Sequence, residues 1–204
     1  TAGWPRRPAR AIGRIALPGH SIRLARINGR QFLLNSDEGI INPLAKGCLP
    51  DEANPFAGVS RPFLTDLTNE RYPKVKGEIR LPINEPLHCG EQTLSGVNAS
   101  VHYHDVDDPA DTTFTMSSMW NAGLRIHDVR DPARPKEVAY FNPGRFRSPA
   151  PLSDNGAATV LGLQNPGGLD QAWAHVRYRP DTGHIWLTTA TGGFWVLELE
   201  PQVR

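Results

Sequence analysis

The sequence predicts an all-β fold, more specifically a β-propeller segment built of four-stranded antiparallel blades. The 204-residue chain contains 19 glycines and 19 prolines, which divide it into short segments of the kind that turns and strands need. No apolar pattern with a 3.6-residue period persists over three turns, so long helices are not expected. The chain also repeats itself, and repeated units of four short strands are typical of propeller blades.

The repeat is clearest between Arg61–Pro82 and Gly123–Gly144. Both segments contain an apolar strand that ends in Asp, a polar turn, a Pro-Lys pair and a second alternating strand. Asp66 and Asp128 are therefore equivalent and lie 62 positions apart. A third, partial copy has Glu198 in the place of this aspartate. Because an acidic residue recurs at one strand end in each unit, we expect a structural role, in which the carboxylate accepts hydrogen bonds from the turn.

Three blades are visible in one propeller segment, 1–204, with approximate units 8–82, 98–144 and 170–204. In the second unit the strands are expected at about 101–106, 113–120, 124–129 and 137–141, with alternating side chains as in a half-buried strand. Asn28-Gly29 and Asp181-Thr-Gly183 are hairpin signals. The long loops 40–60 and 145–169 exceed usual connection lengths, so they are candidates to carry functional residues on one face of the propeller.

The three units are too few to close a ring, since propellers have about 4–8 blades. Pro8–Pro18 resembles the fourth strand of the other units, whereas the third unit reaches Arg204 without a fourth strand. One interpretation is that earlier blades are missing and the complete ring has about seven blades. The other is that two copies of the chain join into a six-bladed dimer and so hide their open edges. We favour the first because the chain begins with Thr1.

The segment Gly123–Phe141, GLRIHDVRDPARPKEVAYF, resembles the LVIVD repeat. It has the glycine, the apolar strand ending in Asp, the Asp-Pro turn, a further proline and a second apolar strand. The first unit matches more loosely, with Asn69-Glu70 in place of Asp-Pro. The resemblance implies a propeller fold and a bacterial cell-surface or secreted protein. It implies no particular activity, because a fold does not determine function.

Charge and composition exclude two classes of partner. The net charge is +1, with 22 basic and 21 acidic side chains spread along the chain, so the sequence predicts neither a nucleic acid nor an anionic membrane as partner. The only basic run is interpreted as a solvated terminal arm; it consists of Arg6, Arg7, Arg10 and Arg14. No apolar run approaches the length of a transmembrane segment.

The two cysteines, Cys48 and Cys89, lie in loop-like sequence rich in Gly and Pro. A disulfide between them would stabilise the fold by about 4 kcal/mol in the chain-entropy model. The alternative is two unrelated free thiols. Since free cysteines prefer burial to loops, we favour the disulfide, which points to an extracellular or periplasmic location.

Four histidines are the candidate metal ligands: His20, His102, His104 and His175. Each lies near the start of the first strand of its unit, and the first strand of a propeller blade lines the central channel. Imidazoles that converge from several blades could hold a divalent transition metal. The alternative is that these histidines hydrogen-bond to neighbouring backbone as structural parts of the repeat.

Two further groups have simpler interpretations. The acidic stretch with Asp105, Asp107, Asp108 and Asp111 lacks the glycine and terminal glutamate of an EF-hand, so a solvated hairpin turn is favoured over a Ca²⁺ site. Four tryptophans are expected to pack between blades; two of them, Trp120 and Trp173, could instead form a binding surface. The set is Trp120, Trp173, Trp186 and Trp195.

The leading functional hypothesis is a non-catalytic binding or scaffold module at the cell surface or outside the cell. Its partners are the missing blades or a second copy of the chain. The alternative is a metal-dependent enzyme, a hydrolase or oxidase, with the four histidines around the channel. No phosphate-binding loop, dinucleotide fingerprint or hydrolase motif is present in the sequence.

Overall fold

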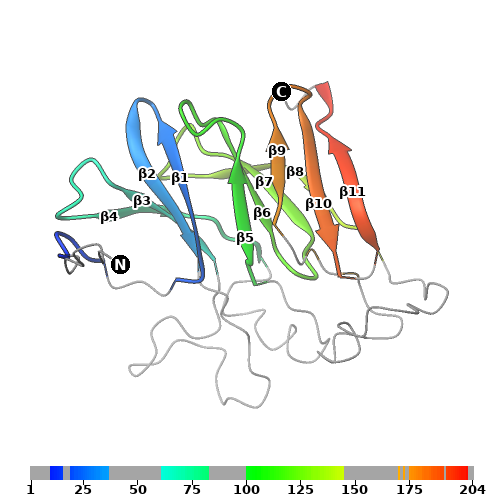
Figure 1. The fold of residues 1–204 in the computed structure, drawn as a ribbon, viewed down its shortest axis with the longest axis horizontal. Helices are drawn as coiled ribbons and strands as arrows, with labels where there is room; N and C mark the ends of the chain where they lie inside the picture. Colours follow the sequence, from blue (N-terminus) through cyan, green and yellow to red (C-terminus); the bar gives the residue numbers. More distant parts are fainter. Residues whose placement is uncertain are drawn as a thin grey trace, which may run out of the picture.

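The computed structural model describes residues 10–15, 19–36, 61–82, 100–144, 170, 172, 175–190 and 192–201. Within these ranges the chain forms β-strands and no α-helix. The strands build three antiparallel sheets that lie side by side (Figure 1). This is the predicted all-β fold with propeller-type blades, and we call the sheets blade 1, blade 2 and blade 3 in chain order.

Blade 1 consists of four strands in the order β1-β2-β3-β4. They are β1 (Ser21–Ile27), β2 (Arg30–Ser36), β3 (Pro62–Asp66) and β4 (Lys74–Glu78). The hairpin between β1 and β2 turns at Asn28 and Gly29, whose φ angles are 50° and 74°. Positive φ at both central residues is what a two-residue hairpin needs, and Asn-Gly provides it at little steric cost.

Blade 2 repeats this arrangement in the order β5-β6-β7-β8. Its strands are β5 (Tyr103–Val106), β6 (Phe114–Ser118), β7 (Leu124–Asp128) and β8 (Lys136–Phe141). All four lie within two residues of the ranges predicted for the second unit. The register between third and fourth strands shifts after Leu64 in blade 1 and after Ile126 in blade 2, which are equivalent positions. The sequence repeat is therefore a structural repeat in detail.

Blade 3 contains three described strands in the order β11-β10-β9. They are β9 (Arg177–Arg179), β10 (His184–Thr189) and β11 (Gly193–Glu198). The turn before β10 contains Gly183 with a φ angle of 72°, as the predicted Asp-Thr-Gly hairpin signal requires. Among the described residues no strand pairs with the outer edge of β11.

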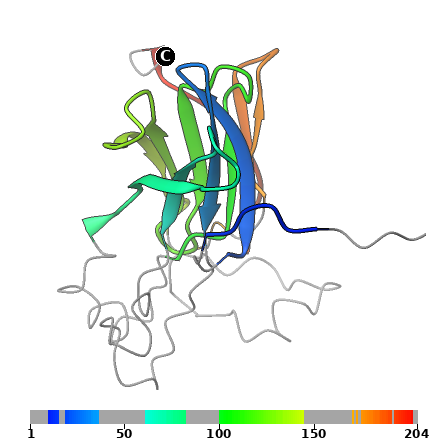
Figure 2. The ribbon, with the colours of Figure 1, turned by 90° about the vertical axis from the view of Figure 1, so that its left-hand side faces the viewer.

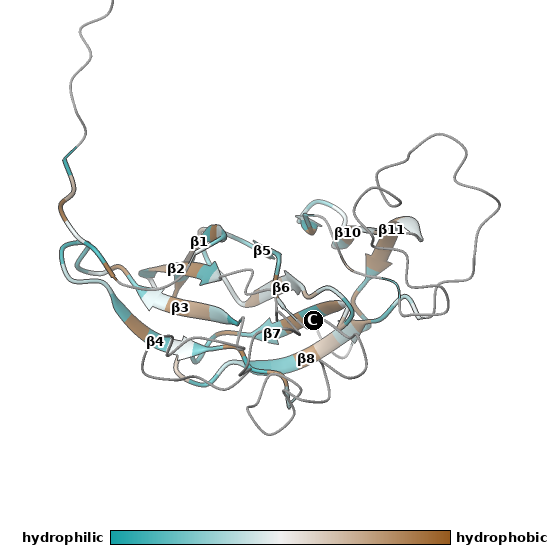
Figure 3. Ribbon diagram, turned by 90° about the horizontal axis from the view of Figure 1, so that it is seen from below, coloured by the Kyte–Doolittle hydropathy of each residue, from teal (hydrophilic) through white to brown (hydrophobic). Residues whose placement is uncertain are grey.

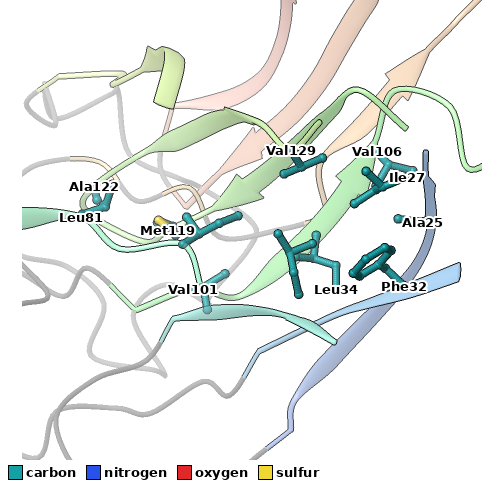
Figure 4. Packing of buried hydrophobic residues seen from close by; sticks show 12 residues of the cluster. Ala25, Ile27, Phe32, Leu34, Leu81, Val101, Val106, Met119, Ala122 and Val129 are labelled. Carbon is teal, nitrogen blue, oxygen red and sulfur yellow. The ribbon is translucent and has the colours of Figure 1, made fainter. Parts of the chain in front are cut away.

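The hydrophobic core lies between the blades rather than inside one sheet. Figure 4 shows the first cluster, in which Ile27, Phe32 and Leu34 of blade 1 face Val106 and Val129 of blade 2. A second cluster joins blades 2 and 3; its fully buried members include Met116, Leu124, Ile185 and Leu187. Burial of each large apolar side chain contributes about 2 kcal/mol, so the contacts between blades hold the blades together.

The blades share one orientation. In Figure 3 the first strands β1 and β5 lie toward one side and the fourth strands β4 and β8 toward the other. Figure 2 shows β1 and β5 standing side by side, and β5 also contacts β9. The first strands are therefore the innermost strands of this propeller segment, as their place in the sequence repeat predicts.

The segment Pro8–Pro18 differs from its prediction as a fourth strand. Its described residues, 10–15, form no strand, because no described strand lies beside them to complete a ladder. They run instead close to the turn between β3 and β4 (Figure 1). In the described part of the chain, no helix is long and apolar enough to cross a membrane.

Candidate functional site

Aromatic rings gather where the three inner strands begin. His20 directly precedes β1, His102 precedes β5, and His175 lies two residues before β9. Because the three strands point the same way in Figure 1, their starts meet at one end of the propeller segment. Three of the four predicted metal ligands therefore come together in space.

Tyr103 lies at the centre of this group. Its ring centroid is 3.7 Å from that of His175 in a stacked arrangement and 4.1 Å from that of His102. The rings of His20 and His102 are also stacked, at 4.9 Å. These four residues, His20, His102, Tyr103 and His175, come from all three blades and are called the imidazole cluster below.

The imidazole cluster is partly open to solvent. His20 and His175 are exposed, Tyr103 is half-buried, and His102 is buried beside Trp120. Burial, followed by the positive charge of Arg177, lowers the pKa of His175 below its ordinary value of 6.5. His175 is therefore neutral at pH 7 and offers one N–H donor and one nitrogen acceptor.

His104, the fourth predicted ligand, has a different environment. Its Nδ1 atom lies 3.0 Å from the Ser117 hydroxyl in blade 2, and its Nε2 atom lies 2.7 Å from the Ser36 hydroxyl in blade 1. Complete burial lowers its pKa to about 3. Both ring nitrogens therefore have a hydrogen-bond partner, and each partner is a serine hydroxyl rather than the backbone group that the structural alternative expects.

Asp105 joins all three blades, although the acidic stretch around it predicts a solvated turn. That interpretation is wrong for this residue, because β5 is the middle inner strand and both its neighbours cover the side chain, which is 3% exposed. Its Oδ1 atom lies 2.8 Å from the Arg23 guanidinium in blade 1. Its Oδ2 atom accepts a hydrogen bond of 2.9 Å from the Tyr178 amide in blade 3.

The rest of the acidic stretch behaves as a hairpin turn. Asp107 Oδ1 accepts hydrogen bonds from the amides of Thr113 and Phe114, each 3.0 Å long. Asp108 Oδ1 accepts one of 2.7 Å from the Ala110 amide. Asp108 thus forms an Asx-type turn, whereas Asp107 holds the two ends of the loop between β5 and β6 together.

Asp66 and Asp128 cap equivalent turns. Asp66 Oδ1 accepts a hydrogen bond of 2.8 Å from the Thr68 amide, and Asp128 Oδ1 accepts one of 2.9 Å from the Arg130 amide. The Thr68 hydrogen bond lowers the pKa of Asp66, and the Arg130 side chain lowers that of Asp128. Glu198 occupies the corresponding end of β11.

Two of the tryptophans show how the third blade packs. The ring of Trp195 in β11 lies 5.1 Å from that of Phe141 in β8, so it packs between blades as predicted. Trp186 contacts Phe194 within blade 3 and lies under the Arg179 guanidinium.

Trp120 is buried. The predicted disulfide pair, Cys48 and Cys89, and the tryptophan Trp173 lie outside the described residues.

No group of three or more His, Cys, Asp or Glu side chains among the described residues is arranged to hold a metal ion. The imidazole cluster instead presents ring faces, imidazole nitrogens and one phenol. Tyr103 was not singled out from the sequence, and Asp105 was considered only as part of the acidic stretch. Both residues alternate with His102 and His104 at the start of the inner strand. This alternation is the signal that would have found them, because successive side chains of a strand point to opposite faces.

Antiparallel sheets that pack face to face, each with its first strand innermost, define this chain as a β-propeller segment. No protein-family model matches it, and no curated protein matches it. Among solved structures, the β-propeller domain of Cps50 (Swd1) from Myceliophteria thermophila is similar, at 17% identity and a TM-score of 0.43. The match covers 88% of this chain and 42% of that one, so this chain spans less than half the length of that domain.

Proposed function

We propose that this chain is part of an LVIVD-repeat propeller and acts as a non-catalytic binding or scaffold module at the cell surface or outside the cell. The observation that carries the binding role is the imidazole cluster. Four rings from three blades meet at one end of the inner strands, and two of them are exposed. Rigid sheets that position rings at one end of a scaffold suit recognition.

The chemistry of the cluster favours a polar ligand with a flat group, or a peptide segment that carries one. Tyrosine and histidine rings offer apolar faces for stacking, and their polar atoms orient what is stacked. His175 is neutral at pH 7, so the site does not depend on a protonated imidazole there. The recognised group is therefore expected to be held by stacking and hydrogen bonds rather than by ion pairing.

A titration followed by NMR tests the binding role. Carbon-proton spectra of the histidine rings are recorded while dipeptides and monosaccharides are added. Each ligand is used with and without an aromatic group, which is the flat group under test. A saturable shift of the His20 and His175 signals, without a shift of the His184 signal in β10, supports the proposal. If every ligand leaves the cluster signals unchanged, or moves all histidines alike, the cluster is not a binding site for these classes.

Elemental analysis distinguishes the hypothesis of a non-catalytic binding module from that of a metal-dependent enzyme. The purified chain and its His175→Ala and His104→Ala variants are analysed for transition metals, with His184→Ala as the matched control. We expect no stoichiometric metal in the folded chain. One metal ion per chain that is lost in His175→Ala and kept in His184→Ala would contradict the non-catalytic module and favour the metal-dependent enzyme.

The family and the location are supported by the sequence. Gly123–Phe141 carries the LVIVD-like pattern, and the turn within it is held by Asp128. Cys48 and Cys89 suit an oxidising compartment. Cell fractionation of the source organism tests the location: the protein is expected in the envelope or secreted fraction, and its recovery with cytosolic markers would overturn this part of the proposal.

A further inference from the structure

A hollow with cationic walls lies at the end of blade 1 where β2 begins and β3 ends. Its volume is about 480 Å³, within the range of small-molecule sites, about 300–1,000 Å³. β1 starts beside the imidazole cluster and ends at the hairpin that leads into β2, so this hollow is a separate site. We call it the basic hollow; its lining includes Arg30, Asp66, Thr68, Tyr72, Lys74 and Lys76.

Positive charge exceeds negative charge in the basic hollow. Three cations, Arg30, Lys74 and Lys76, face one carboxylate, Asp66, so the described lining has a net charge of +2. The Arg30 guanidinium lies 3.9 Å from an Asp66 oxygen, at the outer limit of an ion pair. Both lysines are exposed, and among the described residues neither forms an ion pair. The basic hollow therefore suits an anionic ligand.

The equivalent turn of blade 2 neutralises its own carboxylate. In that turn the Arg130 guanidinium pairs with Asp128. Thr68 takes the place of Arg130 in blade 1, since it follows Asp66 at the same distance as Arg130 follows Asp128. Because threonine carries no charge and is shorter than arginine, the turn of blade 1 has neither the internal cation nor its bulk. The basic hollow is thus a departure of blade 1 from the pattern of the repeat.

Two of the three cations are also specific to blade 1. Lys76 lies at the bulge between β3 and β4, where blade 2 has Val138. Val138 packs against the apolar cluster between blades 2 and 3, whereas Lys76 is exposed and lines the basic hollow. Arg30 corresponds to Thr112, two residues before the position opposite the repeated aspartate. Blade 2 forms without a cation at either position, so the fold does not require these charges.

We propose that the basic hollow binds the phosphate monoester of a small ring compound, such as a sugar phosphate. The phosphate lies among Arg30, Lys74 and Lys76, and the ring lies against Tyr72. A phosphate monoester carries a charge of about −1.5 to −2 at pH 7, which matches the net charge of the lining. Arginine binds two phosphate oxygens through its planar fork, and lysines add point charges. Tyr72 is 70% exposed and offers an aromatic face to the ring.

Isothermal titration calorimetry of the full 204-residue chain with glucose 6-phosphate tests the proposal. Glucose 6-sulfate, whose ester carries a single negative charge, and glucose itself are the control ligands. In dilute buffer at pH 7 we expect saturable binding of glucose 6-phosphate, about tenfold tighter than that of glucose 6-sulfate, and no binding of glucose. Equal affinities of the two esters, or no binding of glucose 6-phosphate, would overturn the proposal.

Two lysines at the same register position provide a matched pair of variants. Lys74 lies opposite Asp66 in blade 1, and Lys136 lies opposite Asp128 in blade 2. Lys74→Ala is expected to weaken the binding of glucose 6-phosphate about tenfold, because Lys74 lines the basic hollow. Lys136→Ala removes the same kind of charge from the next blade and is expected to leave the affinity unchanged. Equal effects of the two substitutions contradict the assignment of the site.

A residue exchange between the blades tests the site in a second way. Lys76→Val gives blade 1 the residue that blade 2 has at its bulge, so the circular dichroism is expected to match the parent while the affinity for glucose 6-phosphate falls about tenfold. A folded Lys76→Val variant with the affinity of the parent would overturn the proposal.

The contact with the ring is tested at Tyr72. Tyr72→Ala is expected to weaken glucose 6-phosphate several-fold and to leave the weaker binding of inorganic phosphate unchanged, since only the sugar has a ring to contact. An equal loss for both ligands contradicts this contact. A hexaglutamate peptide that binds more tightly than glucose 6-phosphate would make an acidic peptide the ligand and overturn the proposed class. None of these results bears on the imidazole cluster, so the binding role proposed there is judged separately.

Discussion

The Nε2 atom of His104 lies 2.7 Å from the Ser36 hydroxyl, and this hydrogen bond joins the inner strand of blade 2 to the second strand of blade 1. The other ring nitrogen is held by Ser117 within blade 2. The imidazole is therefore a polar link between blades 1 and 2, which are also joined by the Arg23–Asp105 ion pair and by an apolar cluster. A polar group in such a place stabilises the fold only while every partner is present.

Replacing His104 by Ala is expected to lower the free energy of unfolding by about 2–4 kcal/mol, because two buried serine hydroxyls lose a partner and a cavity forms. The matched variant His175→Ala removes an exposed ring and is expected to cost less than about 1 kcal/mol. Urea unfolding measures both. Equal losses for the two variants would show that His104 is not a link between blades.

The stability of the chain is expected to fall as the pH falls from about 6.5 toward 4. Burial lowers the pKa of His104 to about 3 and that of His127 to about 4, whereas an unfolded histidine titrates near 6.5. Between these values the unfolded chain binds protons that the folded chain does not. The stabilisation is thus complete above pH 6.5 and is lost as the pH decreases, by about 1.4 kcal/mol per pH unit for each histidine.

The His104→Gln variant tests this sign and its cause. Unfolding free energies are measured by urea titration at several pH values from 7 to 4 for the parent and the variant. His104 and His127 are the two histidines whose pKa values fall to about 3 and about 4, so removing one of them is expected to reduce the slope by roughly half. The same slope in both proteins would show that another group governs the pH dependence.

Asp105→Ala is expected to destabilise the chain by about 2–4 kcal/mol, because it leaves Arg23 and the Tyr178 amide without their carboxylate. Asp108→Ala, in the exposed turn after β5, is expected to cost less than about 1 kcal/mol. Thermal unfolding of the two variants compares them. If Asp108→Ala proved the more damaging, Asp105 would not be the residue that joins the blades.

Gly123→Ala is expected to cost more stability than Gly29→Ala, although both residues have positive φ angles, 78° and 74°. A Cβ atom at Gly123 would lie 2.3 Å from the Phe141 carbonyl oxygen, whereas one at Gly29 would meet nothing within 4 Å. Strain alone is worth about 1 kcal/mol, and the backbone clash adds to it. Chemical denaturation measures the difference; equal losses would mean that β8 can shift away from the turn at no cost.

Much of the fold follows from local sequence. Alternation in Leu124–Asp128, glycine at the turns and the recurrence of Asp66 and Asp128 predict the strands of blade 2 and their copies. These signals are readable because side-chain period, turn geometry and repeat length are properties of short segments. The exception is 10–15, where a sequence typical of a fourth strand lies without a strand partner among the described residues.

The sequence by itself therefore determined the fold class and the blade repeat, and it predicted a convergence of four histidines of which three, His20, His102 and His175, meet. The tertiary structure decided what each side chain contacts. It placed Tyr103 at the centre of the imidazole cluster, enclosed His104 between serines of two blades, and buried Asp105 among partners on blades before and after its own. These outcomes depend on contacts between residues about 70 positions apart, which no local pattern contains, since they form only when whole blades pack face to face.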